Sequence, residues 1–363
     1  MFLSRRTLLA AAPASALPLI WPRLGSGQQS PAEKAAQPAA EAKPWTENTP
    51  QSERAIQRGD DWLLKTMHRD GGCGVDVGQA TDIGCTAMVG LALLAQGNTP
   101  VEGPRSREIQ RIVSFLIRTT ENMPADDITS QMGTQLQNKI GRHAHSFFAA
   151  TFLAEVIGEG WDTEPVRTSL KRVIAAIVGS QTASGSWGDQ SWAPMLGTVM
   201  GWVALRAAHY AGIRVGGSPD LTAKHLVQQM QVNLAQHQGS WMHTLYKNAT
   251  GIRVLYALGM DDEAVAKKAL GDVRQLVAKD NTAFSQAGGE EYLAFHLITE
   301  TMLQKGGDDW AAWYPTVRDK IVGVQNSDGS WSGHHCITSR TFCTAAAILV
   351  LTAPNRYLPI SQA

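Results

Sequence analysis

Residues 325–331, with the sequence Gln-Asn-Ser-Asp-Gly-Ser-Trp, decide the fold, because versions of this segment recur along the chain. Residues 181–187 (QTASGSW) have the same length, the same first residue and the same Gly-Ser-Trp close. Residues 238–241 (QGSW) keep the close, and residues 67–73 (MHRDGGC) form a degraded copy with Cys73 in the place of tryptophan. Each copy stands between an amphipathic helical pattern and a more apolar one. Such a repeat indicates a chain built from stacked helix pairs.

The three residue types in the turn have complementary roles. Glycine lets the chain reverse after a helix in a conformation that would strain other residues. Tryptophan offers a large apolar surface with one N–H that needs an acceptor. The glutamine at the end of the preceding helix can bond to backbone of the neighbouring unit. We therefore expect each turn to staple consecutive helix pairs, in a structural and not a catalytic role.

Six helix pairs can be placed along the chain. Their approximate ranges are 55–97, 107–158, 166–212, 221–259, 262–306 and 310–351. The first helix of each pair is amphipathic, as the i, i+3, i+4, i+7 spacing of Leu170, Val173, Ile174 and Ile177 shows. The second is apolar nearly all round, which is typical of a helix buried on several sides. The sequence thus predicts an all-α (α/α)6 toroid of six helical hairpins; an open α-solenoid is the alternative.

The composition excludes some classes of function. The chain has 363 residues, no formal net charge and only 18% charged residues. It therefore has no electrostatic footprint for nucleic acid. After the N-terminus there is no apolar run long enough for an integral membrane span, so we expect none in the mature chain.

The N-terminus predicts export. Residues 4–9 (SRRTLL) precede an apolar run and resemble a twin-arginine signal. We assign residues 1–25 to this signal peptide, 26–54 to an Ala/Pro-rich linker and 55–360 to the toroid domain. A periplasmic or extracytoplasmic location follows. A closed ring would bring the first and last repeats together, so a seam disulfide such as Cys73–Cys336 is one arrangement that the four cysteines allow.

Tandem Gln-x(3)-Gly-Ser-Trp turns between helix pairs resemble the superfamily of squalene–hopene cyclases and protein prenyltransferase β-subunits, whose repeat is called the QW motif. The resemblance covers about residues 55–351 and implies a toroid that binds an isoprenoid-like apolar ligand in a central cavity. The catalytic signatures of these families are missing. No Asp-x-Asp-Asp run is present, and the zinc positions read Gly289-Glu290-Glu291 and Ser339-Arg340-Thr341 instead of holding Asp, Cys and His. We therefore expect no zinc site of that kind, and no cofactor is identified.

The starts of the inner helices predict a site at one end of the ring. Aligning these helices on their terminal glycines brings four candidate catalytic residues into register: Asp82, His143, Glu291 and Arg340. A carboxylate beside a histidine can do general acid–base work. A metal bound near His334, His335 and Cys336 is the weaker interpretation, because such a row is more often a solvated loop.

Aromatic side chains lie among these charges. We expect five of them to line a ligand cavity: Phe147, Trp192, Tyr246, Tyr292 and Phe342. Aromatic faces can hold an isoprenoid chain or stabilise a carbocation, although each residue alone is as well explained as core. Our first hypothesis is an exported toroid that binds or transforms an isoprenoid-like apolar ligand. The alternatives are a non-catalytic binding or interaction module that uses the toroid mouth and, lower, a polysaccharide-processing (α/α)6 enzyme. The sequence does not identify a protein partner.

Overall fold

The computed structural model of the chain describes residues 47–121, 133–157, 163–188, 191–231, 241–279 and 282–362. The proposed signal peptide and most of the linker lie outside these ranges. Within them the chain is all-α, with two isolated β-bridges and no strand, as predicted. The helices are α2 (Pro50–Leu63), α3 (Ile83–Leu94), α4 (Ser106–Glu121), α5 (Gln135–Lys139), α6 (Ala144–Val156), α7 (Thr163–Gly179), α8 (Pro194–Tyr210), α9 (Ser218–Gln231), α10 (Trp241–Ala257), α11 (Ala264–Lys279), α12 (Thr282–Ser285), α13 (Gly289–Lys305), α14 (Gly307–Gly323) and α15 (Arg340–Thr352).

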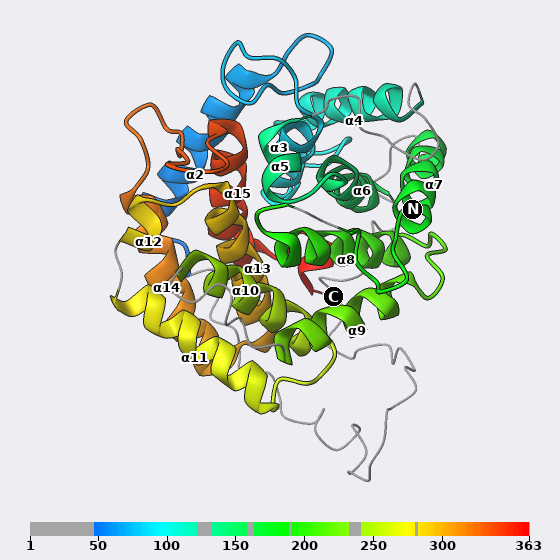
Figure 1. Cartoon of the computed structure of the whole chain (residues 1–363). Helices are drawn as coiled ribbons and strands as arrows, with labels where there is room; N and C mark the ends of the chain where they lie inside the picture. The colour runs from blue at the N-terminus through cyan, green and yellow to red at the C-terminus, as the bar shows by residue number, and fades with distance from the viewer. Residues whose placement is uncertain are drawn as a thin grey trace.

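The inner layer is a closed ring of six helices: α3, α6, α8, α10, α13 and α15. Each packs on the next, and α15 packs on α3, so the chain forms a toroid and not an open solenoid (Figure 1). Every residue of α3 and of α6 is buried. A helix that meets two neighbours, an outer helix and the ring axis has no face left for water.

The outer layer consists of α2, α4, α7, α9, α11 and α14, one for each inner helix. On α4 the buried residues Ile109, Ile112, Val113 and Leu116 form one stripe. The two short helices α5 and α12 precede the inner helices α6 and α13. The first outer helix starts at Pro50, before the expected start near Ala55, because Thr49 caps it by accepting a hydrogen bond from the Ser52 N–H at 3.1 Å.

The two complete Gly-Ser-Trp turns make the same set of contacts. The Trp331 indole N–H donates to the Ile321 carbonyl, and the Trp187 indole donates to the Ile177 carbonyl, each at 2.8 Å. The Gln325 amide donates across the seam to the Ala55 carbonyl at 2.8 Å. The Gln181 amide reaches α9 in the same way, where it donates to the Thr222 hydroxyl at 2.7 Å. The predicted stapling is therefore present at both turns; in the third copy, residues 238–240 lie outside the described ranges.

Glycine is required in the turns even where tryptophan has been lost. Gly329 and Gly185 have φ of 97° and 95°, and a Cβ on either would lie within 2.6 Å of a carbonyl oxygen in the next unit. Gly71 in the degraded copy has φ of 94° and the same close approach, to the Arg111 carbonyl. The backbone turn thus persists, while the fully buried Cys73 stands in the tryptophan position.

The seam between the last and first pairs is closed by hydrogen bonds. Arg58 donates to the carbonyls of Asn326 and Ser327 at 2.9 and 2.7 Å, and the Ser339 hydroxyl donates to the Val75 carbonyl at 2.8 Å. All four cysteines are free thiols. The Cys73–Cys336 disulfide considered from the sequence is therefore not formed, and polar contacts hold the seam instead.

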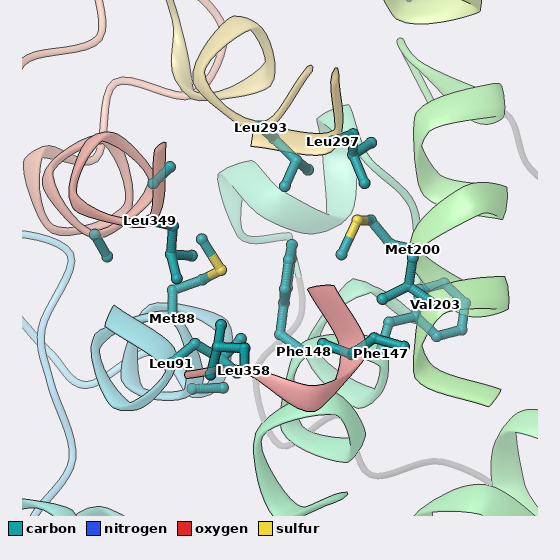
Figure 2. Close-up of a cluster of buried hydrophobic side chains, with 14 of the residues drawn as sticks. Met88, Leu91, Phe147, Phe148, Met200, Val203, Leu293, Leu297, Leu349 and Leu358 are labelled. Carbon is teal, nitrogen blue, oxygen red and sulfur yellow. The ribbon is translucent and has the colours of Figure 1, made fainter. Parts of the chain in front are cut away.

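The ring axis is occupied by apolar side chains (Figure 2). We call ten of them the axial cluster: Met88, Leu91, Phe147, Phe148, Met200, Val203, Leu293, Leu297, Leu349 and Leu358. All ten are buried, and none carries a charge. The interior therefore presents an apolar environment from which water is largely excluded.

One end of the ring, where the inner helices stop, is covered by residues 353–362, which we call the C-terminal strap. After α15 the chain turns through η4 (Ala353–Asn355) and η5 (Pro359–Gln362) and packs on α13 and α8. Leu358 of the strap belongs to the axial cluster. We call this end of the ring the floor, and the end where the inner helices begin the mouth. None of the helices within the described residues is both long and apolar enough for a membrane span.

Candidate functional site

The mouth is roofed by α5 and by the loop of residues 332–339. Two hydrogen bonds join them: the Gln135 amide donates to the Thr338 hydroxyl at 2.8 Å, and the Thr338 N–H donates to the Gln135 side-chain oxygen at 2.9 Å. The loop is also tied to α13, because the Gly289 N–H donates to the Ile337 carbonyl at 2.9 Å. Side chains at the inner-helix starts are therefore covered by segments from distant parts of the chain.

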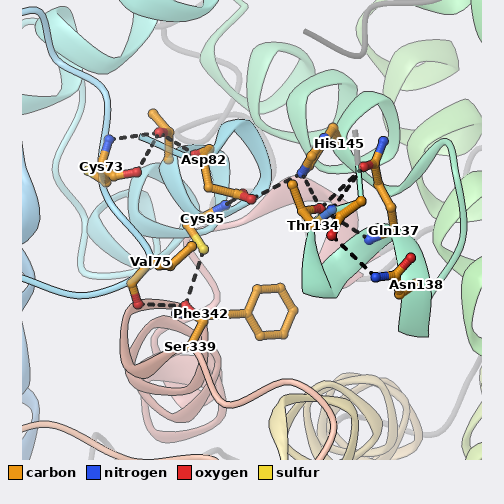
Figure 3. A network of polar contacts seen from close by, with 12 residues as sticks. Cys73, Val75, Asp82, Cys85, Thr134, Gln137, Asn138, His145, Ser339 and Phe342 are labelled. Carbon is orange, nitrogen blue, oxygen red and sulfur yellow. Dashed lines mark hydrogen bonds and ion pairs between the residues drawn. The ribbon is translucent and has the colours of Figure 1, made fainter. Parts of the chain in front are cut away.

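Asp82 lies at the start of α3 and pairs with a histidine of α6 (Figure 3). Its carboxylate accepts from the Cys85 N–H at 2.8 Å, as an N-cap does, and lies 3.2 Å from His145 Nε2. Both side chains are buried. Burial would raise the pKa of Asp82, but the hydrogen bond and the charge of His145, with the Cys85 N–H, lower the pKa below its ordinary value. Asp82 is thus an ionised carboxylate at neutral pH.

Glu291, in the first turn of α13, is enclosed by hydrogen-bond donors. The Tyr246 hydroxyl donates to one carboxylate oxygen, and the Gly288 N–H donates to the other at 2.6 Å. His335 Nε2 lies 3.4 Å from the same second oxygen. His335 is 30% exposed while Glu291 is fully buried, so a part-exposed imidazole lies next to the buried carboxylate.

Glu290, the neighbouring residue, is fully buried and only half satisfied. One carboxylate oxygen accepts from the Ile337 N–H at 3.1 Å, and the other has no hydrogen-bond partner among the described residues. Burial, followed by the charge of Glu291, raises the pKa of Glu290 to about 7. Near neutral pH this carboxyl therefore holds a proton for much of the time.

The mouth thus contains carboxyl groups whose pKa values are shifted in opposite directions. Asp82 is stabilised as an anion, and Glu290 is stabilised as an acid. Such a separation is how a site obtains a proton acceptor and a proton donor from the same type of side chain. Within the described part of the chain, no group of three or more His, Cys, Asp and Glu residues is placed to hold a metal ion.

The other two predicted catalytic residues have different surroundings. His143 is the N-cap residue of α6 and lies against Phe147, with 6.3 Å between ring centroids. Arg340 starts α15, but its guanidinium lies over the Trp62 ring and pairs with Asp328 and Asp76. Among the described residues, Arg340 makes no hydrogen bond or ion pair with Asp82 or Glu291. Its contacts are those of a cation that holds the seam.

The five predicted cavity aromatics divide into three environments. Phe147 belongs to the axial cluster. Phe342 packs edge-on against Phe148 of that cluster, with 5.5 Å between the ring centroids. Tyr246 and Tyr292 are buried, and Tyr246 binds Glu291 as described above. Trp192 differs, because it is 43% exposed and lies beside His243 and Lys139 at the outer rim. Phe147 and Phe342 are therefore the two that lie on or against the axis.

Sequence reasoning missed two residues of this site as candidates. Glu290 appears in the sequence analysis only within the Gly289-Glu290-Glu291 run, although a Glu-Glu pair in a segment expected to be buried is a usable signal. His145 and not His143 is the partner of Asp82. His145 lies three residues before the axial Phe148, so the helical period puts it on the inward side of α6.

Structural comparison places this fold beside type II terpene cyclases. A variant of MstE from Scytonema, in complex with the product merosterolic acid A, superposes with a TM-score of 0.51 at 15% identity, over 85% of this chain and 98% of that chain. Another MstE variant, in complex with the substrate geranylgeranyl dihydroxybenzoate, superposes with a TM-score of 0.52 at 14% identity. The match covers 84% of this chain and 98% of that chain. The apo enzyme superposes with a TM-score of 0.50 at 12% identity, over 85% of this chain and 100% of that chain.

These likenesses establish a terpene-cyclase-like toroid, and at such low identity they establish the fold alone. They do not single out the squalene–hopene cyclases. No protein-family model matches the chain, and no curated protein matches it by sequence.

Proposed function

We propose that this protein binds an isoprenoid-like apolar chain along the ring axis and that Glu290 donates a proton to it. One observation carries the proposal: Glu290, a fully buried carboxyl in the first turn of α13, has its pKa raised to about 7. Glu290 precedes Leu293 by three residues and Leu297 by seven, so the three share one helix face. Leu293 and Leu297 belong to the axial cluster. An acid is thereby placed at the mouth end of an apolar row.

The surroundings fit the binding of such a ligand. The axial cluster includes Met88 and Met200, whose flexible side chains can rearrange around a guest. The aromatic faces of Phe147 and Phe148 can stabilise positive charge that forms on a bound chain. The fold neighbour MstE was solved with geranylgeranyl dihydroxybenzoate as substrate, which is a ligand of this class.

The proton transfer would proceed in a simple way. The O–H bond of Glu290 breaks, a C–H bond forms at an alkene carbon of the ligand, and the positive charge passes to the neighbouring carbon. Glu290 is left as a carboxylate beside Glu291. It regains its proton through Glu291 and the part-exposed His335, which lies 3.4 Å from Glu291. A positioned acid of this kind typically contributes about 10²- to 10⁴-fold in rate.

The test uses the full chain, produced in a host that exports it. Native mass spectrometry should find a co-purified prenyl lipid, and incubation with a geranylgeranyl polyene should give a product detectable by gas chromatography. Glu290→Gln should keep binding and lose at least about 100-fold in product formation, whereas the exposed control Glu263→Gln should change neither. Failure to bind any prenyl chain would overturn the proposal.

Two other outcomes support the alternatives drawn from the sequence. Binding without turnover in the unmodified chain would indicate the non-catalytic module. Release of sugars from a polysaccharide would indicate a glycan-processing enzyme, with the exposed Trp192 as a platform.

We also propose export through the twin-arginine route, on the basis of Arg5 and Arg6. Replacing both by lysine should retain the protein in the cytoplasm of the producing cell, as cell fractionation would show. Unchanged export of that variant would contradict this part of the proposal.

A further inference from the structure

The floor of the ring contains polar groups that are satisfied by the C-terminal strap. Arg253 Nη2 donates to the Ile360 carbonyl at 3.1 Å, and the Gln304 amide donates to the Ser361 carbonyl at 2.9 Å. In the opposite direction, the Ser361 hydroxyl donates to a carboxylate oxygen of Glu300. The floor therefore supplies two donors and one acceptor to a short stretch of backbone and one hydroxyl.

Two of these floor groups are charged and lie deep in the protein. Arg253 is fully buried and lies 3.7 Å from Glu300, which is also buried. Burial lowers the pKa of Arg253, and it lowers the pKa of the nearby His296. Taking ions out of water is unfavourable unless partners compensate for it. The strap hydrogen-bonds to both members of this cluster and helps to cover it, so its closed position keeps these ions desolvated.

The strap also reaches the apolar axis. Leu358 is 5% exposed and belongs to the axial cluster with Met88 and Leu91 (Figure 2). Within four residues the strap therefore places an alkyl group on the axis and two carbonyls and a hydroxyl on the floor. This is the layout of an amphipathic molecule with an oxygenated head.

The fit between the strap and the floor is incomplete. A cavity of about 10 Å³ remains, lined in part by His296, Glu300, Leu358 and Ser361. That volume accommodates about one water molecule. His296 Nδ1, which is buried, has no hydrogen-bond partner among the described residues. The floor thus contains a buried polar atom to which the strap makes no hydrogen bond.

We propose that the C-terminal strap is a displaceable internal ligand and that the floor beneath it binds the oxygenated head of an amphipathic prenyl lipid. A head with a carbonyl oxygen would accept from Arg253 and Gln304, and its O–H would donate to Glu300. The alkyl tail would replace Leu358 on the axis. This inference rests on the proposed function, because it specifies the end through which the ligand enters and the chemistry of its head.

The experiment measures hydrogen exchange and binding in the full chain, with geranylgeranoic acid as the probe. If the acid displaces the strap, its addition should speed amide exchange in residues 355–362 and slow exchange at the end of α13. Ser361→Ala and Leu358→Ala, which loosen the strap without touching the floor, should each bind the acid at least about five-fold more tightly. Ser327→Ala, at an exposed turn, is the matched control and should bind as the unmodified chain does. A C20 hydrocarbon without a head should bind more weakly and show no gain from Ser361→Ala.

The outcomes separate the two proposals. Tight binding of the acid with unchanged or slowed exchange in the strap would overturn the strap inference and leave ligand binding on the axis intact. Absence of binding to the unmodified chain and to both strap variants would overturn both.

Discussion

The mouth and the floor of the ring differ in the charges that they bury. The mouth holds the carboxyls of Asp82, Glu290 and Glu291, whereas the floor holds the guanidinium of Arg253 beside Glu300. Contacts between inner-helix starts, such as Asp82 with His145, show that these helices begin at the same end. Their N-termini favour negative charge and their C-termini favour positive charge. The direction of the inner helices thus favours the carboxylates at the mouth and the guanidinium of Arg253 at the floor, where Glu300 pairs with it.

The two ends also handle their charges differently. At the floor, Arg253 and Glu300 compensate each other, and the strap adds hydrogen bonds to both. At the mouth, Asp82 lies beside His145 and Glu291 lies beside His335, and Glu290 stays close to neutral by holding a proton. The floor therefore resembles a structural ion pair, whereas the mouth has a group that can exchange a proton near neutral pH.

Breaking the floor pair should have the largest effect on stability. Glu300→Ala leaves Arg253 buried without its carboxylate partner, and we expect the free energy of unfolding to fall by about 3–5 kcal/mol. The double variant Arg253→Met with Glu300→Leu removes both charges and should stay within about 1.5 kcal/mol of the unmodified chain. Urea denaturation followed by circular dichroism measures both. Equal destabilisation by the single and double variants would show that packing, and not charge, dominates at the floor.

Glu290 should give the mouth a pH dependence opposite in sign to that of His296 at the floor, whose pKa is lowered by burial. The pKa of Glu290 rises from 4.5 to about 7 on folding, so between these values the folded state binds more protons than the unfolded state. Stability from this group is complete below pH 4.5 and is lost as pH rises to about 7, by a total on the order of 3 kcal/mol. Glu290→Gln should remove that decline and be the more stable protein at pH 8. The comparison is made by denaturation at pH 5 and pH 8.

Asp82 should make stability depend on pH in the opposite direction, so it serves as the internal control. Its pKa is lowered on folding, so its contribution is present above the ordinary value of 3.8 and is lost as pH falls through the lowered pKa. A decline between pH 5 and pH 8 that survives in Glu290→Gln would contradict the assignment of the raised pKa to Glu290.

The fold could be predicted from the sequence because its determinants are local. The Gly-Ser-Trp turns at residues 185–187 and 329–331 mark the junction between the outer and the inner helix of a pair, and helix periodicity separates the two layers. The closure of the ring was predicted from the number of helix pairs, because six pairs can close into a toroid. The strap was not anticipated, because residues 353–362 have no helical period and are held by side chains from α10 and α13 that are distant in sequence.

The site could be predicted only in part. Asp82 and Glu291 stand at helix starts, where acidic residues are favoured, so alignment of the inner helices located them. The raised pKa of Glu290 depends on burial beneath the loop of residues 332–339, and that burial is a tertiary property. The role of Arg340 depends on Asp328 and Asp76, which reach it across the turn and the seam.

The smallest expected effect concerns the cap that Asp82 supplies at the mouth. Asp82→Ala removes the acceptor for the Cys85 N–H and the partner of His145, and we expect a loss of about 1–2 kcal/mol. Asp82→Asn keeps an oxygen that can cap α3 but removes the charge, so it should lose less than Asp82→Ala does. The difference between the unmodified chain and Asp82→Asn then measures the charge interaction with His145, and it should shrink in a His145→Gln background. Thermal unfolding of the four proteins makes the comparison, and an undiminished difference in that background would mean that the charge of Asp82 acts on another group of the mouth.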